Sequence, residues 1–166
     1  MPATPDTLGL GSPTSLTEAR RRVAFPVATP AASAFGRPDR VHVDDAVPPG
    51  GRVTLVYLPR PDLPEVGGTG VGMLVTQFRA RVDDDVVHKL VGSGARVTPI
   101  AIGGHRGYWI SGPPHVMFYV DAEGRFREET LRLAANTLVW QRAGTTFRIE
   151  SALDRSQSVK VARSLL

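Results

Sequence analysis

A two-residue alternation of apolar and polar side chains runs through residues 119–151, within the last fifty residues of the sequence. In its clearest stretch Phe147 and Ile149 fall on one side of an extended chain, and the other side carries Thr146, Arg148 and Glu150. This period is typical of a β-strand with one face on a core and one face in water. No nucleophile, metal cluster or phosphate-binding loop interrupts it. The region therefore predicts a sheet with a wet face and indicates no chemistry.

Turn residues divide the rest of the chain into further short strands. The strongest turns are expected at Pro48–Gly51, Gly103-Gly104 and Ala143-Gly144, the last closing a hairpin. Residues 59–72 hold three prolines and four glycines, and we expect a mobile loop there. The strands are expected at residues 40–44, 53–58, 73–80, 96–102, 107–111, 115–120, 126–133, 138–141 and 145–151.

Three short segments have helical signatures. Ser15 and Glu18 have the spacing of a capping box, and so do Asp154 and Gln157. Residues 83–90 begin with three aspartates, which favour a helix N-terminus. The sequence thus predicts an α+β fold: a curved, mainly antiparallel sheet of six to eight strands with about three short helices packed on one face. Residues 1–14 are expected to be a flexible leader, and residues 15–166 a single α+β domain.

Composition excludes several classes of function. The chain has 166 residues, no cysteine and a net charge of +4, so disulfides and thiolate chemistry are excluded. Its cations are scattered among acidic neighbours and only Arg20–Arg22 form a run, which argues against a nucleic-acid footprint. The first residues lack the order of a signal peptide, and no apolar run approaches the roughly 20 residues that span a bilayer.

Candidate chemistry is sparse. No two of the four histidines have the close spacing of a metal pair, and residues 67–72 lack the lysine of a phosphate-binding loop. We therefore predict no catalytic residue, cofactor or metal. One segment suits contact with a ligand or partner, because aromatic rings stand there beside cations: His105, Arg106, Tyr108 and Trp109. The competing interpretation, which the alternation favours, places the two rings on opposite faces of a strand.

Several short motifs in order resemble a bacterial domain of unknown function, found at the outside-facing end of anti-sigma-factor-like membrane proteins and some lipoproteins. The motifs lie at residues 15–19, 25–30, 53–57, 107–112, 138–144, 147–150 and 161–165, so the likeness covers about residues 15–166. All but two of the 20 cationic residues are arginine. This bias suggests an actinobacterial version. The resemblance implies an extracytoplasmic domain tethered to the cytoplasmic membrane by an upstream segment that this chain lacks. It brings no catalytic residues.

These observations predict a non-enzymatic extracytoplasmic sensor, or a ligand- or protein-binding domain of a membrane-tethered regulator. Its partner would be a protein, a peptide or an anionic envelope component, and not nucleic acid. The alternative is a small hydrolase or transferase acting on cell-envelope material. That alternative requires a pocket in which His105 or His115 meets a carboxylate.

Overall fold

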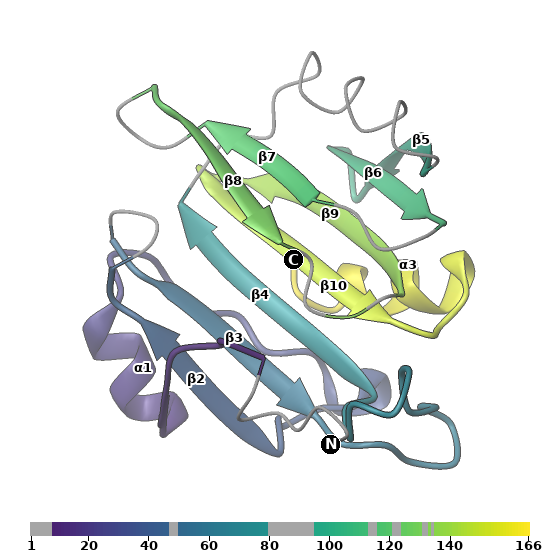
Figure 1. The fold of residues 1–166 in the computed structure, drawn as a ribbon, viewed down its shortest axis with the longest axis horizontal. Coiled ribbons are helices and arrows are strands. Elements are labelled where there is room, and N and C mark those ends of the chain that lie inside the picture. The colour runs from purple at the N-terminus through teal and green to yellow at the C-terminus, as the bar shows by residue number, and fades with distance from the viewer. Residues whose placement is uncertain are drawn as a thin grey trace.

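In the described residues the fold is an eight-stranded antiparallel sheet with two α-helices, which confirms the expected α+β class (Figure 1). The computed structural model describes residues 8–46, 50–79, 95–112, 116–120, 124–130, 133 and 135–166. In spatial order the strands are β1 (Ser12–Thr14), β2 (Arg40–Asp44), β3 (Arg52–Tyr57), β4 (Met73–Arg79), β10 (Thr145–Ser151), β9 (Asn136–Arg142), β6 (His105–Ser111) and β5 (Arg96–Ile102).

Two tight hairpins set the register of the second half of the sheet. Ala143 and Gly144 both have positive φ, as do Gly103 and Gly104, so each pair forms the type I′ turn whose twist suits adjacent strands. The turns pair Arg142 with Thr145 and Ile102 with His105. A separate two-stranded sheet consists of β7 (Val116–Val120) and β8 (Phe126–Thr130), so the ambiguous segment after residue 125 is a strand, as expected.

Helix α1 (Leu16–Arg22), the short 3₁₀ turn η2 (Ala32–Ala34) and helix α3 (Arg155–Arg163) are the helical elements of the described residues. Both predicted caps are present: Ser15 accepts from the Glu18 N–H, and Asp154 forms a full capping box with Gln157. The helix expected at residues 83–90 lies outside the described residues. The part of the chain that the structure describes therefore contains two α-helices, where about three were expected for the whole domain.

The first face of the sheet carries the larger apolar core. Residues from β2, β3, β4, β10, β9 and β6 point into it, and α1 and α3 cover it with Ala19, Val161, Ala162 and Leu165. Trp140 is 1% exposed and stacks on Phe147 with ring centroids 5.2 Å apart. Aromatic pairs at this separation stabilise a core beyond the area that they bury. The alternation predicted this face correctly.

The second face of the sheet differs from the prediction. The side expected to be wet is buried: Arg148 is 1% exposed, and Glu150 and Thr146 are fully buried. The register places Arg148 between Thr76 on β4 and Val139 on β9, in the middle of the sheet. The prediction fails on this face because alternation shows which side chains share a face and does not show what covers that face.

Two segments expected to be flexible contribute side chains to this second face. The expected leader contains β1, which pairs with β2, and Leu10 is buried. Residues 59–72 also turn inward: Val66 and Val71 are buried, and the Val66 N–H donates a hydrogen bond to the Val71 carbonyl at 2.8 Å. A second apolar cluster on this face therefore joins the two segments to the sheet: Leu10, Val56, Val66, Val71, Leu74 and Leu133.

Replacing Trp140 tests the assignment of the first face. Trp140→Ala should lower the free energy of unfolding by about 3–5 kcal/mol, because it removes a buried aromatic side chain and leaves a cavity. Trp140→Phe should cost less, since it keeps a ring against Phe147 and removes an indole N–H that is buried without a partner. Urea unfolding measures both, with the exposed Leu166→Ala as the control. Equal stability of Trp140→Ala and the parent would contradict the packing.

Candidate functional site

The ligand surface expected at residues 105–109 is not a single surface. Tyr108 and Trp109 are each 9% exposed and lie on opposite faces of β6, Trp109 within the first core. Tyr108 sits opposite Val139 on the second face. His105 is half-buried and Arg106 exposed at the hairpin end of β6. The structure therefore separates the two aromatic rings, as the competing interpretation had it.

The glycine inside this segment has a packing role. A Cβ atom on Gly107 would lie 2.9 Å from Trp140 Cβ and 2.6 Å from the Val139 carbonyl oxygen. Gly107 is the register partner of Trp140, so its missing side chain makes room for the indole. The motif that suggested stacking on a ligand is thus explained by the packing of the core.

A different site lies beside the same hairpin, between α3 and β5. An open groove of about 690 Å³ is lined by Ile100 and Ala101 of β5 and by one side of α3. The helix contributes Arg155, Ser156, Val159, Lys160 and Arg163, from its first residue to its last. Ligand-binding pockets have volumes of this order. The groove combines apolar side chains, Ile100 and Val159, with three cations.

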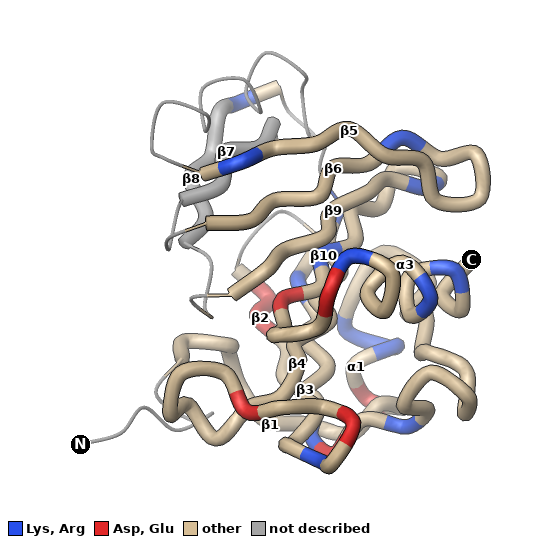
Figure 2. Tube along the Cα trace, turned by 90° about the vertical axis from the view of Figure 1, so that its right-hand side faces the viewer, with Lys and Arg blue, Asp and Glu red and all other residues tan. Residues whose placement is uncertain are grey.

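Helix geometry explains why the three cations share a side. Arg155, Val159 and Arg163 are spaced at i, i+4 and i+8, and Lys160 lies on the neighbouring stripe. At 1.5 Å per residue, Arg155 and Arg163 are about 12 Å apart along the axis. Among the described residues, none of the three cations forms an ion pair. Figure 2 shows the cationic positions of α3 on the side of the molecule that faces the viewer, next to cationic positions at the ends of β6 and β9.

Sequence reasoning missed this groove for an identifiable reason. It assigned Val159, Ala162 and Leu165 to the apolar side of the last helix. The structure buries Ala162 and Leu165, as expected, and Val161 with them. Val159 is half-buried: it packs against the first core and also lines the groove. The i, i+4, i+8 spacing of Arg155, Val159 and Arg163 was a visible sign of a second, mixed face.

A buried ion pair lies on the second face, far from the groove in the order of the strands. Arg148 Nε is 2.9 Å from Glu150 Oε1, and the Leu133 N–H donates to Glu150 Oε2 at 2.8 Å. Charges taken out of water require partners, and each of these two meets the other at short range. The pair is two residues apart on one strand, so it holds the centre of the sheet and faces no pocket found among the described residues.

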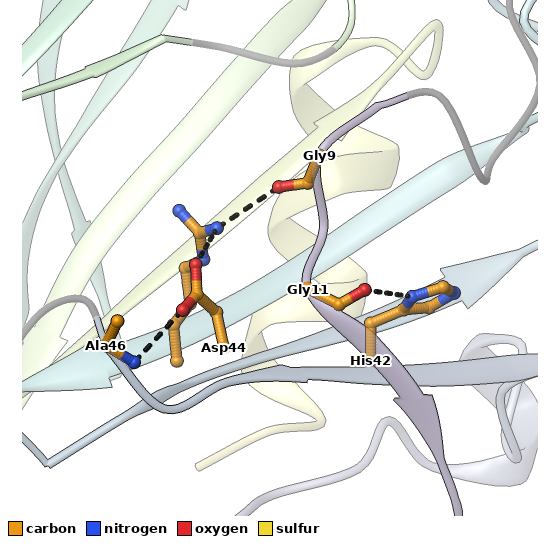
Figure 3. Close-up of polar contacts among 6 residues, drawn as sticks. Gly9, Gly11, His42, Asp44 and Ala46 are labelled. Carbon is orange, nitrogen blue, oxygen red and sulfur yellow. Dashed lines mark hydrogen bonds and ion pairs between the residues drawn. The ribbon is translucent and has the colours of Figure 1, made fainter.

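A second polar cluster holds the N-terminal segment against β2 and β3 (Figure 3). Arg52 Nη2 donates to the Gly9 carbonyl at 3.3 Å and to Asp44 Oδ2 at 3.1 Å. His42 Nδ1 lies 3.2 Å from the Gly11 carbonyl, and because a carbonyl only accepts, Nδ1 carries the hydrogen. A Cβ on Gly11 would meet the Val43 carbonyl oxygen at 2.3 Å, so this close approach requires glycine. The cluster attaches Gly9 and Gly11 of the expected leader to β2 and β3.

Tyr57 fixes the turn that follows η2. Its buried hydroxyl donates to the Gly36 carbonyl at 2.8 Å, and burial raises the pKa of this phenol well above its ordinary value. Phe35 precedes Gly36 with a positive φ of 75°, an uncommon conformation for a side chain of this size. The bond from Tyr57 therefore holds a locally unfavourable turn beside α3, where Phe35 and Lys160 line a smaller pocket of about 320 Å³.

The described part of the chain holds no group of three or more histidine, aspartate and glutamate side chains placed to bind a metal. The enzyme alternative requires either His105 or His115 beside a carboxylate. His115 lies outside the described residues. In the segments that the structure describes, no helix is both long and apolar enough to cross a bilayer. No protein-family model matches the chain, and neither curated proteins nor solved structures give a match.

The buried pair gives a direct test of the second face. Arg148→Met should lower the free energy of unfolding by about 3–5 kcal/mol, because it leaves Glu150 charged and buried without its cation. The double variant Arg148→Met/Glu150→Leu should be more stable than Arg148→Met, since it removes both charges. Urea unfolding of the full double-mutant cycle measures the coupling. The exposed Arg20→Met serves as control, and additive effects of the two single changes would contradict the pairing.

Proposed function

We propose that this chain is a non-enzymatic binding domain, displayed outside the cytoplasmic membrane by a tethered regulator, which recognises an acidic segment of a partner protein in the groove between α3 and β5. The observation that carries the proposal is the row of cations along α3, next to Ile100 and Val159, for which the described part of the chain supplies no ion-pair partner. The location outside the membrane is supported by the sequence resemblance alone.

The chemistry of the groove favours an acidic partner. Arg155, Lys160 and Arg163 offer guanidinium and ammonium groups, which bind carboxylates through charge-assisted hydrogen bonds. The half-buried side chains of Ile100 and Val159 lie between them and suit an apolar side chain of the partner. A ligand that is both acidic and partly apolar therefore satisfies every lining group better than a simple anion does.

The shape of the surface favours a protein segment over a lipid bilayer. Proteins that lie on membranes insert large exposed apolar side chains beside their cations. Among the described residues, Leu166 is the large apolar side chain that is exposed, at 41%. The cations of α3 line a concavity, whereas a bilayer presents a flat surface. A chain that enters the groove contacts all of them.

Magnitudes indicate a weak, salt-sensitive complex. An exposed ion pair contributes about 0.2–1 kcal/mol, so three pairs add at most about 3 kcal/mol. Added salt screens these interactions over about 8–10 Å at physiological strength. Such an affinity suits a domain held close to its partner by a tether, because tethering raises the effective concentration.

Neutralising the α3 cations tests the binding site. The triple variant Arg155→Gln/Lys160→Gln/Arg163→Gln should bind a labelled 20-residue polyglutamate at least tenfold more weakly than the parent does, measured by fluorescence anisotropy at low salt. The matched control Arg20→Gln/Arg21→Gln/Arg37→Gln removes the same charge from exposed positions elsewhere. Equal losses in both variants would show a bulk charge effect. Binding to phosphatidylglycerol vesicles without binding to polyglutamate would assign the groove to membranes.

Protease accessibility tests the location. Protease added outside intact spheroplasts should degrade the domain in its natural full-length protein, while a cytoplasmic marker survives. Survival of the domain until the membrane is lysed would contradict an extracytoplasmic position.

A further inference from the structure

The strand that borders the groove ends the sheet. Strand β5 is the last in the order, and within the described residues no strand pairs with its outer side. Pro99 and Ala101 of this strand are exposed. An edge strand presents unpaired backbone N–H and C=O groups, which is the usual template for adding another strand.

The hairpin determines which backbone groups of β5 point outward. Ile102 pairs with His105 across a two-residue turn, so Ile102 directs its N–H and C=O toward β6. Alternate residues of a strand do the same, and those between them direct their backbone groups the other way. The outward residues are therefore Val97, Pro99 and Ala101.

Pro99 removes one donor from this edge and leaves the others. Proline has no N–H, and it is tolerated in an edge strand where that N–H would face away from the sheet. Its outward position explains why it fits within β5. The three outward residues retain the N–H groups of Val97 and Ala101 and all three carbonyl groups. Five of six ladder groups are thus available, which discourages indiscriminate pairing and still permits a specific partner.

The groove lies where the side chains of an added strand would go. Ile100 shares the first face of the sheet with the side chains that α3 packs against, and the groove lies between Ile100 and α3. A strand paired with β5 would place every second side chain on this face, beneath α3. Side chains four residues apart on such a strand are about 13–14 Å apart. That separation matches the 12 Å or so between Arg155 and Arg163.

We propose that the acidic segment binds as a ninth strand on β5, with alternate side chains entering the groove: an apolar one against Ile100 and Val159, flanked by carboxylates for Arg155, Lys160 and Arg163. Backbone pairing gives the affinity and the side chains under α3 give the selectivity. This inference rests on the proposed function and names the conformation of its ligand. A second copy of the chain is a poor occupant, because a two-fold pairing of β5 strands would bring two cationic α3 faces together.

Backbone-modified peptides test this mode of binding. The probe is the acetylated, amidated peptide Thr-Glu-Thr-Val-Thr-Glu-Thr, whose two glutamates and valine fall on one face of a strand. Two further versions are N-methylated on alternate amides. One version carries the methyl groups on the amides at one edge of the peptide strand, and the other carries them on the amides at the opposite edge. Methylation of the set that faces β5 should weaken binding at least tenfold, measured by NMR titration, and methylation of the other set should change it less than about threefold. Equal effects of the two sets would overturn strand addition.

The protein side supplies two further readouts. Saturating peptide should slow amide hydrogen exchange at Val97 and Ala101 at least tenfold, because the added strand would accept hydrogen bonds from these outward N–H groups, which no described strand pairs with in the free protein. Pro99→Val restores the missing donor and should tighten binding about two- to fivefold, with sedimentation showing a monomer. A self-associating Pro99→Val protein that no longer binds peptide would favour a second copy as the occupant.

The outcomes separate this inference from the function on which it rests. Polyglutamate binding that depends on the α3 cations, together with no protection at Val97 and Ala101, keeps the groove and overturns strand addition. Failure of both polyglutamate and the heptapeptide to bind overturns the two together.

Discussion

Strand β10 is the element on which the rest of the structure depends, because both of its faces are buried. Phe147 and Ile149 enter the first core, while Arg148 and Glu150 neutralise each other on the second face. Strand β10 pairs with β4 on one side and β9 on the other, and so joins the N-terminal and C-terminal halves of the sheet. A strand buried on both faces usually carries apolar side chains on both. Here one face meets the same requirement with paired charge.

Such a pair contributes more to specificity than to stability. Burying two charges has a desolvation cost, and their mutual attraction offsets it only when the charges are close together. Arg148 Nε and Glu150 Oε1 meet this condition at 2.9 Å. An apolar pair would tolerate a shift in register, but Glu150 must also accept the hydrogen bond of Leu133. A slip of one residue would move both charges into the apolar first face. The register at the centre of the sheet is therefore specified, because a shifted register would bury these charges in the apolar core.

Local sequence patterns predicted local structure well, but they predicted poorly which side chains are buried by segments distant in the sequence. The alternation around Phe147, the cap at Asp154 and the turn at Ala143 all depend on neighbouring residues, and each is present in the structure. Burial of Arg148 depends on the layer that covers it, and strand β1 depends on β2 more than twenty residues later. The groove was missed for a related reason. Which stripe of a short helix is exposed depends on how the helix is set on the sheet, and the assignment of Val159 to the core could not include that.

The division between centre and edge explains where binding can evolve in such a fold. At the centre each strand has two neighbours and each side chain has a packed environment, so substitutions there change stability before they change recognition. At β5 the sheet ends, and one set of backbone groups has no neighbour among the described strands. Helix α3 lines the groove beside that edge and supplies charge through side chains that lie outside the core. Pro99 then limits the edge to partners able to bind with one hydrogen bond fewer. Because the complementary charge lies on α3 and the backbone template on β5, a ligand must satisfy both elements at once, and that joint requirement is what makes a weakly charged edge selective.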